Sequence, residues 1–205
     1  MPAMQRTAFV LVGAVALLLA ACGGHTMNAP PVGFLSQPAL MRKSSDGSWN
    51  YSAKAVDWAS YKSVFVPVVT FADGAYEDNV WASAADLPTL SGKLQSALQA
   101  AMGSRYAAAA GAGAGTLVVR AQIVKAVPNA PARNLAPQTQ IGGTGYGYGE
   151  VAIEVVDGGD GRVLLEFADV QSTTRFSTEK LTVWGSFEKS IGEWADRIAN
   201  SCQAK

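Results

Sequence analysis

The spacing of apolar residues along the chain predicts two amphipathic helices. Leucines and a methionine recur at helical spacing over residues 87–102, directly after a Ser83–Asp86 segment with the pattern of a capping box. A second helical stripe runs over residues 186–202 and places Trp194 and Cys202 on one apolar face. We expect Trp194 to anchor this last helix in the core and Cys202 to be buried beside it.

Four other segments have the character of β-strands. Residues 63–71 are apolar on both faces, and Pro67 inside them cannot donate to a sheet, which indicates an edge or a bulge. Residues 116–127 alternate so that one face is wholly apolar, as in a half-buried strand. Residues 150–156 and 162–169 are joined by a turn rich in Asp and Gly, which favours a hairpin.

The element order is β-α-β-β-β-α. It predicts one globular α+β domain over residues 34–205, with a mixed four-stranded sheet and the two main helices on one face. Residues 128–148, between the second and third strands, lack regular periodicity and are rich in Pro, Asn, Gln and Gly. Segments of this length without periodicity are usually functional loops or disordered.

An apolar run near the N-terminus ends at a cysteine. Residues 8–21 contain no charged or strongly polar side chain, and they are shorter than the roughly 20 residues of a membrane-spanning helix. They have the length of a signal-peptide core, and the two alanines before Cys22 suit a peptidase cleft. We therefore expect a lipoprotein signal peptide over 1–21, lipidation at Cys22 and a flexible tether over 22–33.

The residue after the cysteine bears on location. An Asp directly after the lipidated cysteine favours retention in the inner membrane. Here Gly23 follows Cys22, which indicates the outer membrane. Two or more acyl chains make such an anchor stable. The sequence thus predicts a protein held on the periplasmic face of the outer membrane by its lipid, with an envelope protein or a glycan as a further partner.

Composition excludes several classes of function. The 16 Lys and Arg residues are matched by 16 Asp and Glu residues, so no basic excess supports binding of nucleic acid. The single histidine, His25, precedes the folded domain, which removes Ser-His-Asp and Cys-His catalysis and most zinc chemistry. With Cys22 lipidated, Cys202 has no intrachain disulfide partner. We expect neither a cofactor nor a metal.

Several sequence features follow one another in order over residues 33–202. They are Gly33–Ser36, the run Val56–Val64, the pair Pro67–Val68, the run Gly115–Ala121, the strand from Gly149–Glu150 to Asp157 and Gly161, and the pair Trp194–Ala195. In this order they resemble the bacterial lipoproteins of the family called domain of unknown function 3313. That family has no established activity, so the resemblance implies a lipoprotein without implying a chemistry.

Candidate binding residues lie in the 128–148 segment. Arg133 offers a planar hydrogen-bonding fork, and Tyr146 and Tyr148 offer flat amphipathic surfaces. The alternative is a mobile loop whose tyrosines only cover the edge of the sheet. We expect a binding site here, if the protein has one, because binding residues collect on loops that a rigid scaffold positions.

A carboxylate pair is the remaining route to catalysis. Glu150 and Glu154 face the same way on one strand, whereas glycoside hydrolysis needs two carboxylates that flank a cleft. Two outward glutamates are typical of a solvated surface. We therefore predict a non-catalytic binding or structural component of the envelope, with a carboxylate-dependent glycan hydrolase as the alternative.

Overall fold

The computed structural model describes residues 25–76, 80, 82–135, 145–172 and 177–203. Its strands are β1 (Arg42–Lys43), β2 (Trp49–Ser52), β3 (Ser63–Phe65), β4 (Thr70–Phe71), β5 (Ala107–Ala108), β6 (Thr116–Val127), β7 (Tyr148–Asp157) and β8 (Val163–Ser172). Its helices are α2 (Leu87–Gly103), α3 (Pro131–Asn134) and α5 (Gly185–Ser201), with 3₁₀ turns η1 (Pro38–Leu40), η2 (Trp58–Ser60), η3 (Ala84–Asp86) and η4 (Glu179–Leu181).

These strands form one mixed sheet in the order β1-β2-β8-β7-β6-β3-β5, and β4 also pairs with β6. The strands from β1 to β6 in this order are antiparallel, whereas β3 and β4 run parallel to β6. The predicted α+β class with one mixed sheet is confirmed. The prediction of four strands is wrong, because the sheet has eight.

The predicted strand 63–71 is divided into β3 and β4, with Pro67 in the interruption between them. A proline lacks the N–H that a ladder needs, so pairing stops there and resumes further along β6. The predicted order β-α-β-β-β-α also omits β1, β2 and β5. These strands are two to four residues long and follow no hydrophobic period, because backbone pairing with a neighbour creates them.

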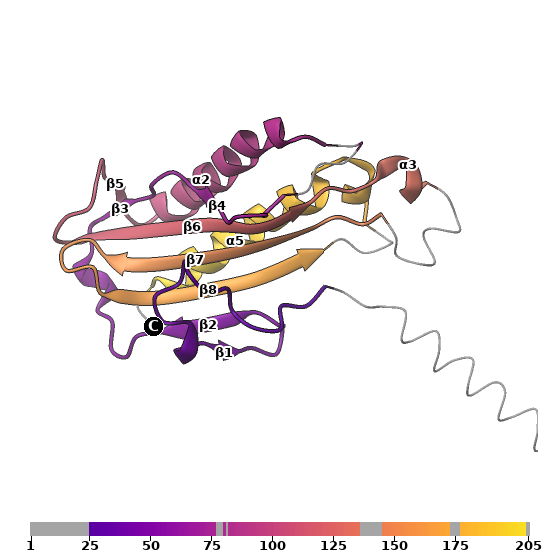
Figure 1. Cartoon of the computed structure of the whole chain (residues 1–205). Coiled ribbons are helices and arrows are strands. Elements are labelled where there is room, and N and C mark those ends of the chain that lie inside the picture. The colour runs from indigo at the N-terminus through magenta and orange to yellow at the C-terminus, as the bar shows by residue number, and fades with distance from the viewer. Residues whose placement is uncertain (1–24, 77–79, 81, 136–144, 173–176, 204–205) are drawn as a thin grey trace, which may run out of the picture.

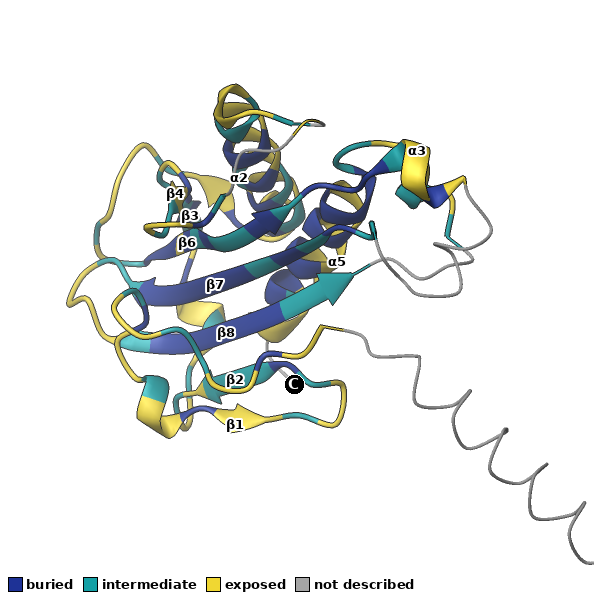
Figure 2. Ribbon diagram, turned by 45° about the vertical axis from the view of Figure 1, so that its right-hand side comes forward, coloured by how far each residue is buried: buried dark blue, intermediate teal, exposed yellow. Residues whose placement is uncertain are grey.

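Helices α2 and α5 pack against each other on one face of the sheet, as predicted (Figures 1 and 2). Ser83 and Asp86 form the predicted capping box, which begins in η3 just before α2. The apolar stripe of α2 and the face of α5 around Trp194 are buried against the inward positions of β6, β7 and β8. Gly149 permits this close approach, because an added Cβ there would lie 2.5 Å from the Phe187 ring.

The opposite face of the sheet is covered by residues 27–41, which we call the strap (Figure 1). Met27, Leu35 and Met41 of the strap are buried against Ala152 and Ala168 of the sheet. Together with the His25 ring, which is stacked on Tyr148, these contacts show that the chain meets the domain from His25 onward, within the segment that the sequence assigns to a tether. No helix among the described residues is long and apolar enough to cross a membrane.

Candidate functional site

The start of the 128–148 segment is fixed by the fully buried Asn129. Its amide nitrogen donates to the carbonyl oxygens of Glu179 (3.0 Å) and Thr182 (2.7 Å). Its Oδ1 accepts from the Gly147 N–H (2.6 Å) and the Ser186 hydroxyl (2.7 Å). One side chain thus joins the chain after β6, the η4 turn, the approach to β7 and the first turn of α5.

A second buried asparagine extends this framework. The Asn134 amide nitrogen donates to the carbonyl oxygens of Gly145 (3.1 Å) and Lys180 (2.9 Å). The backbone N–H of Ala130 also donates to Gly145 (2.8 Å). Residues 145–148, α3 and η4 therefore form one packed end of the domain, which we call the α3 end.

The structure brings the three predicted binding residues together at the α3 end. Arg133 is exposed in α3. Its Cβ lies 3.3 Å from the position that a Cβ on Gly145 would occupy, and Gly145 directly precedes Tyr146. The Lys180 ammonium lies 6.0 Å from the centre of the Tyr146 ring. Tyr148 is half-buried, and its ring is stacked on His25 at a centroid distance of 3.9 Å. Residues 136–144 and the predicted lipidation site Cys22 lie outside the described residues.

A row of charged residues crosses the other face of the sheet. Arg120 of β6 pairs with Glu154 of β7, and Glu154 pairs with Glu166 of β8. Directly paired residues share one face of a sheet, so the three side chains are neighbours. Arg120 forms an ion pair with Glu154, whose side chain is fully buried.

The strap closes this row. The Ser36 N–H donates to Glu154 Oε1 (3.1 Å), and the Gln37 N–H donates to Glu166 Oε1 (2.6 Å). Glu166 is also fully buried, and its second oxygen has no hydrogen-bond partner among the described residues. Burial raises the pKa of Glu166, an effect that the strap N–H groups and Arg120 partly offset.

The expectation that Glu150 and Glu154 share a solvated surface is wrong for Glu154. The strap crosses the outward face of β7 and takes this carboxylate out of water. Glu150 is half-buried, and burial raises its pKa while the charges of His25 and Lys125 oppose the rise. The two glutamates therefore do not flank an open cleft.

Other features of the described residues offer little room for a ligand. One pocket of about 60 Å³ is lined by Gln171, Ser172, Ser177, Ser186, Lys189, Ser190 and Glu193. Small-molecule sites usually enclose roughly 300–1,000 Å³, so this pocket is too small for a ligand of that kind. No group of three or more His, Cys, Asp or Glu residues in the described part of the chain could hold a metal ion.

Two predicted core positions are confirmed. Trp194 is 1% exposed, contacts the Phe187 ring edge-on, and donates from Nε1 to Oδ2 of the buried Asp169 (3.0 Å). Cys202 is a free, fully buried thiol whose pKa is raised to about 12 by burial. Neither residue is placed to contact a ligand.

Sequence reasoning missed Asn129, Arg120, Glu166 and the strap. The register of the β7–β8 hairpin would have placed Glu166 opposite Glu154, because the two lie at similar distances from the Asp157–Gly161 turn. Asn129 carries no such signal, since its four side-chain partners are distant in the sequence.

Comparison with known proteins defines the family. Residues 30–198 match the model of the family described as protein of unknown function (DUF3313), and the chain belongs to this family. No curated protein matches the sequence.

Solved structures are similar to the chain at low identity. The PelC dodecamer from Paraburkholderia phytofirmans is 10% identical, with 77% of this chain and 97% of that chain covered and a TM-score of 0.46. A hypothetical protein from Chlamydia trachomatis is 13% identical, with coverages of 71% and 99% and a TM-score of 0.48. A DUF4136 family protein from Bacteroides thetaiotaomicron is 12% identical, with coverages of 75% and 93% and a TM-score of 0.40.

Proposed function

We propose that the protein is a lipoprotein of the outer membrane, anchored through Cys22, and that it acts by binding and not by catalysis. Anchoring is supported by the uncharged run 8–21, which stops at a cysteine preceded by two alanines. The mature protein then faces the periplasm and serves as a binding or structural component of the envelope.

One observation carries the choice of binding over catalysis. Glu154, half of the only carboxylate pair that the sequence offered for glycan hydrolysis, is fully buried beneath the strap. Its two oxygens are occupied by the Ser36 N–H and the Arg120 guanidinium. A carboxylate in this position has no access to a glycosidic bond, which leaves Glu150 without the partner that the hydrolytic mechanism requires.

The α3 end is the surface that we propose for binding. Arg133, Tyr146 and Tyr148 lie together there on a framework that Asn129 and Asn134 hold in place. Tyrosine and arginine residues are enriched among the interface residues that contribute most of the binding energy. The framework fixes these side chains before any partner arrives, which lowers the entropy cost of binding.

Anchoring is tested by Cys22→Ser in a bacterial host that processes lipoproteins. We expect the variant to leave the membrane fraction and to lose labelling by an alkyne analogue of palmitate. Cys202→Ser is the matched control, because it removes the other cysteine and should change neither property. Unchanged labelling and membrane retention of the Cys22→Ser protein would contradict the anchor.

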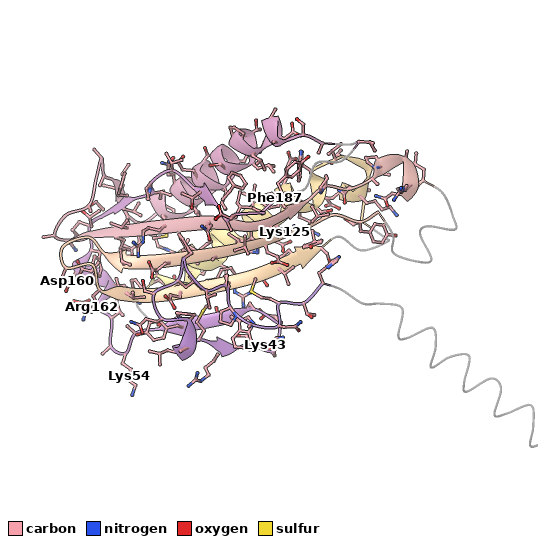
Figure 3. All side chains as sticks on the ribbon, in the orientation of Figure 1. Lys43, Lys54, Lys125, Asp160, Arg162 and Phe187 are labelled. Atoms are coloured by element: carbon pink, nitrogen blue, oxygen red, sulfur yellow. The ribbon has the colours of Figure 1, made fainter. Side chains whose placement is uncertain are left out.

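Binding at the α3 end is tested by crosslinking in intact envelopes. A triple Arg133→Ala, Tyr146→Ala, Tyr148→Ala variant should lose crosslinked products that the wild type forms. A matched Lys54→Ala, Asp160→Ala, Arg162→Ala variant alters three exposed residues away from the α3 end and should keep these crosslinked products (Figure 3). If the purified wild type hydrolyses a peptidoglycan or polysaccharide substrate and Glu150→Gln does not, the result would instead support the alternative of a glycan hydrolase.

A further inference from the structure

The chain is fixed to the domain almost immediately after the proposed anchor. His25, three residues after Cys22, stacks on Tyr148 with an angle of 23° between the rings. Two residues later, the Met27 carbonyl oxygen accepts from the Lys43 ammonium (3.0 Å) and the Trp49 indole (3.1 Å). Little free tether therefore separates the anchor from the folded domain.

The chain length sets a limit on this separation. A fully extended chain spans at most about 3.3–3.6 Å per residue, so the Cα of Cys22 lies within about 11 Å of the Cα of His25. Because His25 contacts Tyr148, this limit ties the proposed lipid attachment point to the neighbourhood of the α3 end. The opposite end of the sheet, where the Asp157–Arg162 turn lies, points away from it (Figures 1 and 3).

The α3 end has the composition of a surface that contacts lipid headgroups. Leu135 is 69% exposed and Leu181 is 46% exposed, although both are large and apolar. Tyrosines are enriched at membrane interfaces, where the ring meets the acyl boundary and the hydroxyl meets water. Tyr146 and Tyr148 are half-buried at this same end of the domain.

The charges at this end fit the same environment. Arg133 and Lys180 have long apolar stems that can lie along the acyl boundary while their cationic groups reach the headgroups. Glu179, on the same turn as Lys180, and the half-buried Glu150, which interacts with His25, are acidic residues that oppose them. Apolar and aromatic contacts, more than net charge, therefore favour the membrane.

We propose that the α3 end docks onto the lipid surface that holds the anchor, with Leu135, Leu181, Tyr146 and Tyr148 at the headgroup level. This proposal rests on the lipid anchor of the proposed function, and it names the bilayer as the partner of that same surface. The anchor makes docking intramolecular, so weak contacts that would not retain a free protein suffice here. Docking would orient the sheet, with the Asp157–Arg162 turn directed into the periplasm.

The proposal is tested with the mature lipidated protein in vesicles of phosphatidylethanolamine and phosphatidylglycerol. An environment-sensitive fluorophore is attached at Leu135→Cys and, in a separate variant, at Leu181→Cys. Asp160→Cys is the matched control, because it is exposed on the opposite turn (Figure 3). The native Cys202 thiol is fully buried and does not compete for the label.

We expect the fluorophores at positions 135 and 181 to shift to shorter wavelength and to be quenched by nitroxide-labelled lipids. Quenching should be at least about twofold stronger than at position 160, because interfacial groups lie roughly 5–10 Å into the headgroup region. Two separate positions keep the test valid where one substitution disturbs the fold.

Two different failures are distinguished. Protein that does not float with the vesicles contradicts the lipid anchor and therefore the proposed function. Protein that floats, but whose labels at 135 and 181 are quenched no more than the label at 160, overturns the docking alone. In that case the α3 end is exposed to the periplasm and available to a protein partner.

Discussion

Glu154 and Glu166 lie directly opposite each other on β7 and β8, and both are fully buried, yet among the described residues the ion pair of Arg120 is with Glu154 and not with Glu166. One cation therefore compensates a site with two carboxylates. Burial raises the pKa of Glu166, and the Gln37 and Ser36 N–H groups and the charge of Arg120 only partly offset the rise. The pair holds the strap to the sheet through the N–H groups of Ser36 and Gln37.

Glu166→Gln should stabilise the protein near neutral pH by about 1–3 kcal/mol, because a neutral amide replaces a buried carboxylate whose desolvation is only partly compensated. Because the folded state raises the pKa of Glu166, its contribution to stability is present below the unfolded pKa and is lost as the pH rises through the folded pKa. The gain should therefore vanish below the ordinary glutamate pKa of about 4.3. Urea unfolding at several pH values measures it.

Glu154→Gln is the matched control for the neighbouring carboxylate and should have the opposite sign. It removes the ion pair with Arg120, a charge-assisted bond at a fully buried oxygen, and should cost about 1–3 kcal/mol. Equal effects of the two substitutions would contradict the unequal pairing of the carboxylates.

Trp194→Ala should lower the free energy of unfolding by about 3–5 kcal/mol, because it opens a cavity between α5 and the sheet. Trp194→Phe keeps most of the volume but removes the indole N–H that binds Asp169, and should cost about 1–3 kcal/mol. Thermal and urea unfolding give both values. A neutral Trp194→Ala variant would mean that α5 does not pack as described.

Asn129→Ala should be among the most destabilising single polar substitutions, with a loss of at least about 3 kcal/mol. It leaves two carbonyl oxygens, one N–H and one hydroxyl without their asparagine partner, and each unpaired buried group costs about 1–3 kcal/mol. The exposed Asn200 is the control, and Asn200→Ala should change stability by less than about 0.5 kcal/mol. Similar effects of the two would show that Asn129 does not organise the α3 end.

The Cys202 thiol should resist modification in the folded protein. Burial raises its pKa to about 12, and the thiolate is the reactive form. Near neutral pH the thiol is therefore protonated, and its burial keeps a thiol reagent away from it. In the Cys22→Ser protein, one thiol should react with a chromogenic disulfide reagent in urea and none in buffer. Fast reaction in buffer would require the end of α5 to open.

Elements that bury one face over many residues could be predicted from the sequence. The stripe of α2 and the alternation of β6 each repeat several times, and their bounds of 87–103 and 116–127 agree with the predictions within one residue. The short strands β1 and β5 give no repeat to detect. Their pairing depends on which backbone lies beside them, which local sequence does not encode.

The candidate site also contains residues that local sequence can predict and residues that it cannot. Arg133, Tyr146 and Tyr148 could be singled out because their side-chain chemistry and their position in a long aperiodic segment are local properties. The role of the strap could not, because residues 34–37 meet Glu154 and Glu166 only after more than a hundred residues of intervening chain have folded. The same separation led to the wrong prediction that Glu154 is solvated.

The shortness of the outermost strands has a consequence for crowding. β1 and β5, at the two margins of the sheet, are each two residues long, and β1 consists of Arg42 and Lys43. A long, uncovered edge strand favours pairing with the edge strand of another copy, whereas a short or charged edge strand disfavours it. Proteins confined to a membrane plane meet one another far more often than proteins in bulk solution. With such margins, copies that the proposed lipid anchor would confine to one membrane plane can collide repeatedly without pairing into a continuous sheet.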